Sequence, residues 1–132
     1  MKKSNFFKVS ASLLLINIPL ASYADHCDSK IINNLTKPVT VSFSTTRGDV
    51  HFKDSSCPEN GPCTINPNDS VGIVYTRTDS DIDGTVDADD IGSLPYTNFS
   101  GQGVLEECPH SNDSNSVNGA ISMGHHGEIV LN

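Results

Sequence analysis

Six acidic side chains between residues 79 and 90 have the spacing of a loop that wraps a calcium ion. In such a loop of about twelve residues, oxygen atoms at positions 1, 3, 5, 7, 9 and 12 surround the ion, and a glycine at position 6 makes the sharp turn. Gly84 stands at position 6, and position 7 would contribute its backbone carbonyl. We therefore predict one calcium site with the ligands Asp79, Asp81, Asp83, Thr85, Asp87 and Asp90.

The same segment resembles the calcium loops of dockerin repeats and of other bacterial extracellular EF-hand-like proteins. The resemblance covers Asp79 to Ile91 and includes an aspartate at position 12, Asp90, as in those loops. Val86 matches the inward-pointing aliphatic residue that pins such a loop to the fold. A dockerin needs a second copy, which this sequence lacks, so the resemblance implies a calcium site and not dockerin function. The alternative is a solvated acidic loop without an ion.

The first 24 residues have the organisation of a secretory signal peptide. Lys2 and Lys3 give a positive start, residues 9–20 are mostly apolar, and small residues at positions 22 and 24 suit a signal peptidase. The apolar run is too short to span a membrane. We expect cleavage after Ala24 and one exported domain over residues 25–132, either periplasmic or secreted, from a bacterial source.

The mature chain is strongly acidic. The whole sequence has a formal charge of −8, and residues 1–24 contain three lysines and no acidic residue, so the mature chain carries −11. A chain with this negative charge does not attract nucleic acid or an anionic membrane surface. We therefore expect neither partner, and no membrane anchor.

Four cysteines in an exported chain indicate two disulfides, and four cysteines allow three pairings. We favour Cys57–Cys63, which closes a tight proline-containing loop, together with Cys27–Cys108, which ties the first strand to a late segment. A bridge of that long span stabilises the fold by about 4 kcal/mol in the chain-entropy estimate. The alternative is a four-cysteine metal site, but no C-x-x-C occurs and the expected compartment is oxidising.

Alternating apolar and polar residues predict short strands throughout the mature chain. In residues 39–44, Val39, Val41 and Phe43 share one face of a strand. Similar signals occur at residues 30–33, 50–52, 63–65, 71–76 and 96–105, and residues 120–131 read as a closing hairpin. About seven strands separated by turns favour an all-β fold, a small antiparallel β-sandwich with the calcium loop as an insertion.

The remaining chemistry-bearing residues favour binding over catalysis. Histidines 51, 110, 125 and 126, with Met123, could form a zinc or copper site, but adjacent strand residues point to opposite sides, so His125 and His126 cannot easily chelate together. The sequence contains no G-x-S-x-G elbow and no glycine-rich phosphate loop. Arg47-Gly48-Asp49 matches the tripeptide that integrins recognise, over three residues only.

The sequence as a whole predicts an exported, disulfide-stabilised, calcium-binding β-sandwich that is not an enzyme and binds an extracellular protein or glycan. One alternative is a small secreted hydrolase or metal-dependent enzyme that uses the surface histidines 51, 110, 125 or 126. Another alternative is a subunit of a surface assembly, which would expose an unpaired strand edge.

Overall fold

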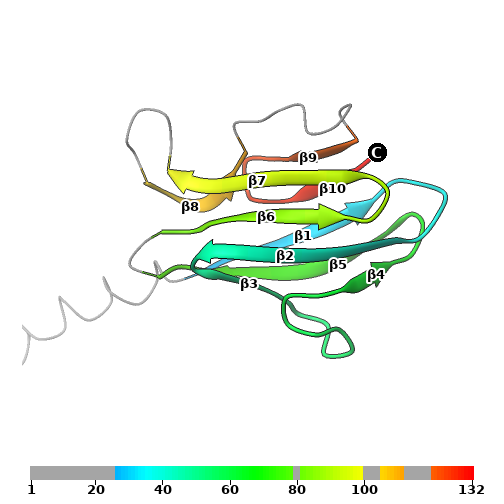
Figure 1. Cartoon of the computed structure of the whole chain (residues 1–132), viewed down its shortest axis with the longest axis horizontal. Coiled ribbons are helices and arrows are strands. Elements are labelled where there is room, and N and C mark those ends of the chain that lie inside the picture. Colours follow the sequence, from blue (N-terminus) through cyan, green and yellow to red (C-terminus); the bar gives the residue numbers. More distant parts are fainter. Residues whose placement is uncertain (1–25, 79–80, 100–104, 112–119) are drawn as a thin grey trace, which may run out of the picture.

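The structure, a computed structural model, describes residues 26–78, 81–99, 105–111 and 120–132. These residues form ten strands and no helix, and the strands make two five-stranded sheets that lie one behind the other (Figure 1). The all-β prediction is confirmed, while the count of about seven strands was too low. Across the described ranges, no helix is present that could span a membrane.

The first sheet has the strand order β3-β5-β1-β10-β9. Its central strand β1 pairs antiparallel with β5 and parallel with β10, so the predicted all-antiparallel arrangement is wrong for this pair. Its strands are β1 (His26–Asn33), β3 (Asp49–Phe52), β5 (Asp69–Thr76), β9 (Ile121–Met123) and β10 (Ile129–Leu131).

The second sheet has the order β4-β2-β6-β7-β8, and its pairs are all antiparallel. Its strands are β2 (Val39–Arg47), β4 (Cys63–Ile65), β6 (Asp83–Ala88), β7 (Gly92–Phe99) and β8 (Leu105–His110). The strand β6 lies between β2 and β7 in the front layer of Figure 1.

The inward faces of both sheets meet in one apolar core. Along β2 the predicted face is confirmed, because Val39, Val41 and Phe43 are all buried. The Phe43 ring of the second sheet lies 5.6 Å from the Phe52 ring of the first, measured between ring centroids. Complete burial of one aliphatic core side chain stabilises the fold by about 1.5–3 kcal/mol, so this core is the main source of stability.

Both favoured disulfides are present. Cys27–Cys108 links β1 of the first sheet to β8 of the second, with a Cα–Cα distance of 5.4 Å. Cys57–Cys63 closes the loop that leads into β4, with a Cα–Cα distance of 5.3 Å. The long bridge therefore joins the two sheets covalently.

Candidate functional site

The acidic segment predicted to wrap an ion is a β-strand over most of its length. Asp83–Ala88 forms β6, which pairs with a neighbouring strand on each side. A strand rises about 3.3 Å per residue, so the Cα atoms of Asp83 and Asp87 lie about 13 Å apart. Calcium–oxygen distances are only about 2.3–2.6 Å, so this extended strand cannot close around one ion. The loop conformation predicted from the sequence is therefore corrected.

The predicted ligands fall into two groups at opposite ends of β6. Asp81 and Asp83 lie where the strand begins, whereas Asp87 and Asp90 lie at the turn into β7, and Thr85 stands between the two groups. Asp79 is outside the described residues. In the described part of the chain, no three His, Cys, Asp or Glu side chains lie close enough together to hold a metal ion. Calcium binding stays a prediction, and a site of the predicted type requires β6 to give up its extended form.

Gly84 has a packing role in place of the turn role that the calcium template gave it. It lies directly opposite Tyr96 in the register of β6 and β7. A Cβ atom at this position would collide with the Tyr96 hydroxyl and would lie 2.6 Å from the Ser44 carbonyl oxygen. The glycine therefore lets the Tyr96 ring lie across the strand, which is a common reason for glycine inside a sheet.

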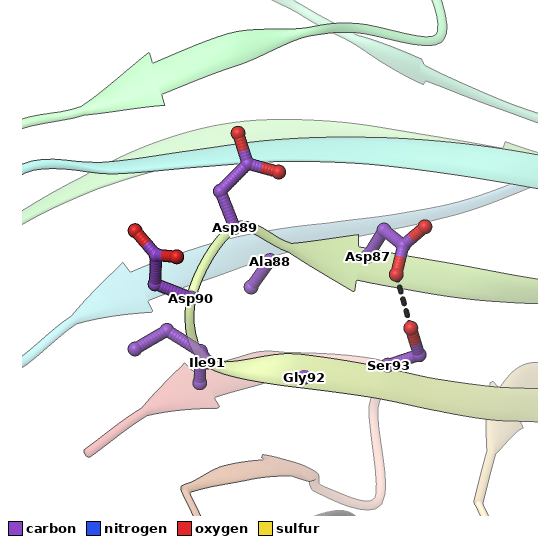
Figure 2. Close-up of a pocket in the computed structure, with 7 residues that line it drawn as sticks. All are labelled: Asp87, Ala88, Asp89, Asp90, Ile91, Gly92 and Ser93. Atoms are coloured by element: carbon purple, nitrogen blue, oxygen red, sulfur yellow. Dashed lines mark hydrogen bonds between the residues drawn. The ribbon is translucent and has the colours of Figure 1, made fainter.

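The turn between β6 and β7 carries a cluster of carboxylates. Figure 2 shows Asp89 and Asp90 next to each other at the tip of the hairpin, while the Asp87 carboxylate accepts a hydrogen bond from the Ser93 hydroxyl. Asp90 has a φ of 65°, and the Ile91 amide donates to the Ala88 carbonyl at 3.0 Å, so the backbone turns tightly here. The residues from Asp87 to Ser93 line an open depression of about 440 Å³.

At the opposite end of β6, the Arg47 side chain lies against both aspartates. Its Nη1 atom lies 2.6 Å from Asp81 Oδ2, and its Nε atom lies 3.8 Å from Asp83 Oδ2. The pairing register between β2 and β6 shifts between Thr45 and Arg47. Two of the predicted calcium ligands are thus paired with one cation of the chain itself.

The surface around this ion pair combines charged, polar and aromatic groups. Phe99, at the end of β7, is 52% exposed and is the one exposed large apolar side chain among the described residues. Phe99 and Arg47 both line a depression of about 390 Å³. We call the lining of this depression the Arg47 face: Arg47, Asp81, Asp83, Thr97, Asn98 and Phe99.

Two buried residues, Asn98 of the Arg47 face and Ile82 in the sequence between Asp81 and Asp83, fix the geometry of this face. Ile82, between the two aspartates, is completely buried and anchors them. The Asn98 side chain, also buried, accepts a hydrogen bond from the Ile82 amide at 3.0 Å, and the Asn98 amide donates to the Ile82 carbonyl at 3.1 Å. Asp81 is further held by paired backbone hydrogen bonds with Thr78 of 2.9 and 3.2 Å. The carboxylates are therefore positioned before any partner arrives.

The Arg47-Gly48-Asp49 tripeptide forms the connection between β2 and β3. Gly48 has a φ of 70°, and an added Cβ would lie 2.5 Å from the Thr76 carbonyl oxygen. The Asp49 carboxylate accepts a hydrogen bond from the Asn60 side chain at 2.9 Å. Local contacts thus account for all three residues of the motif.

The four histidines that could serve an enzyme are divided among distant parts of the first sheet and one edge of the second. His51 lies on β3, at the edge of its sheet opposite to β9. His125 and His126 occupy the turn between β9 and β10. His110 and His125 line one depression together with Met123, so the structure brings together part of the set that the sequence suggested as a zinc or copper site. The sequence could not show which of these histidines lie close together, because His110 comes from the other sheet.

Comparison with known proteins adds little to this geometry. No family model and no curated protein matches the sequence. Among solved structures, IP-1A from Alcaligenes faecalis is similar, with 13% sequence identity and a TM-score of 0.40. The similarity covers 58% of this chain and 64% of that chain, which is less than two thirds of its length. At this TM-score the similarity says nothing about function. Fold and site together define a two-sheet, disulfide-linked all-β protein.

Proposed function

We propose that the protein is an exported binding module whose recognition surface for an extracellular protein or glycan is the Arg47 face. The observation that carries the proposal is the exposed Phe99 ring beside the paired Arg47 guanidinium. Aromatic and arginine side chains are enriched among the residues that dominate binding energy in interfaces. A partner that covers Phe99 removes apolar surface from water, while the carboxylates and the guanidinium offer directional hydrogen bonds.

The rigidity of this surface supports the proposal. Arg47 and Phe99 stand at the ends of paired strands, and Asp81 lies two residues before β6 in a bridge with Thr78. Arg47 is also held by two carboxylates, so less side-chain freedom is lost when a partner binds. Sites built on regular elements are positioned more accurately than sites on loops.

A recognition role fits the Arg47 face better than catalysis does. The residues that line it include no histidine, cysteine or lysine, the groups that most often serve as nucleophile or as general base. Asp81 and Asp83 are engaged by Arg47. The groups of this face can bind and orient a partner, and the module is proposed as non-enzymatic.

Export is part of the same proposal. Two observations support it: the signal-peptide organisation of residues 1–24 and the two disulfides, which persist in oxidising compartments. Calcium binding by the acidic segment stays a separate prediction, and recognition through Phe99 and Arg47 does not depend on it.

The test uses arrays of immobilised glycans and extracellular proteins, probed with the oxidised protein and two variants. Phe99→Ala should abolish binding, since it removes the exposed ring. Ile91→Ala is the matched control, because it truncates an apolar side chain at the other end of the same β6–β7 hairpin. Binding that survives in Phe99→Ala, or that is lost equally in Ile91→Ala, would place recognition elsewhere.

A second pair of variants tests the charged part of the face. Arg47→Ala should weaken binding to the same partner, whereas Lys53→Ala should not. Lys53 is the matched control because it is also a half-exposed cation paired with a carboxylate, at 3.1 Å from Asp28 on the other sheet. Equal effects of the two substitutions would show that only net charge matters.

A further inference from the structure

A second depression lies where the edge of one sheet meets the closing hairpin of the other. It has a volume of about 310 Å³, and the residues that line it include His110, His125 and Met123. His110 ends β8 of the second sheet, Met123 ends β9 of the first sheet, and His125 follows in the turn. The fold thus brings three metal-binding side chains from two sheets into one place.

Covalent and hydrogen-bonded contacts hold the two sides of this depression together. The Cys27–Cys108 disulfide fixes β8 only two residues before His110. Pro109 is buried, and a Cβ atom added to Gly127 would lie 3.4 Å from its Cδ atom, so β8 packs against the turn. The Tyr75 hydroxyl donates a hydrogen bond of 2.6 Å to the Gly127 carbonyl.

The turn that carries His125 is itself tightly closed. The Gly124 amide donates to the Glu128 carbonyl at 2.8 Å, and the Gly127 amide donates to the Gly124 carbonyl at 3.2 Å. The Glu128 carboxylate lies against Gly124, so a negative charge adjoins the depression. His125 is exposed, and His110 and Met123 are half-buried, with the His110 Nε2 atom shielded from solvent.

We propose that His110, Met123 and His125 form a binding site for a soft monovalent metal ion, Cu(I). Thioether ligands select Cu(I), and imidazole binds copper well. All four cysteines are in disulfides, so no thiolate competes for the ion. Zinc prefers four nitrogen, sulfur or carboxylate ligands, whereas the described residues around the depression bring only two imidazoles to the lining.

The proposed copper site goes beyond the proposed recognition function, and either proposal can be wrong while the other is right. The lining of the depression and the Arg47 face share no residue. The copper site rests on two imidazoles and a thioether, and the recognition surface rests on Phe99 and Arg47.

The test is a titration of untagged, full-length, oxidised protein with Cu(I), kept reduced by ascorbate, in competition with a chromogenic Cu(I) chelator. We expect one equivalent of Cu(I) to be withdrawn from the chelator. His110→Gln, His125→Gln and Met123→Leu should each lower the affinity by about tenfold or more, because loss of even an outer-shell partner typically costs about 10–100-fold. His126→Gln, a neighbouring exposed histidine in the same turn, is the matched control and should change nothing.

A second measurement uses Ag(I), a redox-inert analogue of Cu(I), and the methionine methyl signals in NMR spectra. The chain has two methionines, Met1 and Met123, so the signal of Met123 is readily assigned. We expect that signal to shift saturably at one equivalent of Ag(I), while the dispersed backbone spectrum confirms that every variant is folded. Absence of Cu(I) withdrawal, an unshifted Met123 methyl signal, or an equal loss in His126→Gln would overturn the proposal.

Discussion

At the scale of single residues, the structure gives Tyr96 a role that the sequence did not indicate. Its ring lies across Gly84 and contacts the Phe43 and Tyr75 rings at centroid distances of 6.3 and 5.8 Å. Its hydroxyl is buried and has no hydrogen-bond partner among the residues that the structure describes. Burial raises the pKa of the Tyr96 hydroxyl well above its usual range, and the nearby carboxylates of Asp49 and Asp83 raise it further.

The first prediction concerns Gly84. Gly84→Ala should lower the free energy of unfolding by about 1–3 kcal/mol, the usual cost of overpacking, because the new methyl group meets Tyr96 and the Ser44 carbonyl. Gly72→Ala, in β5, is the control: its methyl group would meet only the flexible Lys53 side chain, and we expect a change below about 1 kcal/mol. Urea denaturation measures both, and equal effects would contradict the packing role of Gly84.

The second prediction concerns pH. The pKa values of Tyr75 and Tyr96 are both raised in the folded state, in each case first by burial. The unfolded chain therefore loses these protons first, so the contribution of these two groups to stability is constant below pH about 10 and falls above it, by about 1.4 kcal/mol per pH unit for each tyrosine. Tyr96→Phe should keep or raise the stability at pH 7, because it removes an unpaired buried hydroxyl.

Denaturant unfolding at pH 8, 9, 10 and 11 checks this expectation. Tyr96→Phe should show about half the slope above pH 10 that the unmodified protein shows. Identical slopes would mean that the Tyr96 hydroxyl ionises as easily in the folded state as in the unfolded chain.

At the scale of elements, the strand β6 occupies the acidic segment that the sequence predicted as a calcium loop. Its backbone is paired with β2 and with β7, and its inward side chain Val86 is completely buried. Conversion to an ion-wrapping loop would break hydrogen bonds on both sides and would remove Val86 from the core. Both changes oppose calcium binding in the form that the sequence predicted.

The third prediction follows from this pairing. Amide hydrogen exchange of Val86 and its neighbours in β6 should be slow both without calcium and at about 10 mM, beyond the range of weak extracellular modules. A change in exchange that saturates with calcium, and that is lost in an Asp79→Ala, Asp81→Ala double variant, would instead establish the predicted loop. Calorimetric titration of the same two proteins gives the stoichiometry.

At the scale of the whole molecule, the long disulfide joins two sheets that are otherwise held together by the core. Cys27–Cys108 spans a sequence separation of 81, whereas Cys57–Cys63 spans 6. In the chain-entropy model the long bridge restricts the unfolded chain far more than the short one does. It also fixes β8 beside the turn that carries His125, so it links stability to the proposed copper site.

The fourth prediction compares the two bridges. Replacement of Cys27 and Cys108 together by alanine should lower the free energy of unfolding by about 4 kcal/mol, and replacement of Cys57 and Cys63 by about 2 kcal/mol. The first double variant should also weaken Cu(I) binding, since His110 loses its anchor, while the second should leave it unchanged. Urea unfolding and the Cu(I) titration measure the two effects, and equal losses of stability would contradict the model.

The sequence by itself determined those features that depend on local pattern and on simple chemistry. Alternation of apolar and polar residues predicted the buried face of β2, and the even number of cysteines predicted two bridges with the observed pairing. It could not predict ten strands or the parallel β1–β10 pair, because both depend on which distant segments meet.

Only the tertiary structure decided the conformation of the acidic segment. The physical reason is that calcium loops and β-strands both repeat every two residues, so the sequence pattern fits either one. Calcium loops place ligands at alternate positions, and strands place solvent-facing residues at alternate positions too. Asp81, Asp83 and Asp87 satisfy both patterns, while Ile82, Val86 and Ala88 are buried. The outcome depends on β2 and β7, which pair with the backbone of this segment and supply the core that its apolar side chains enter.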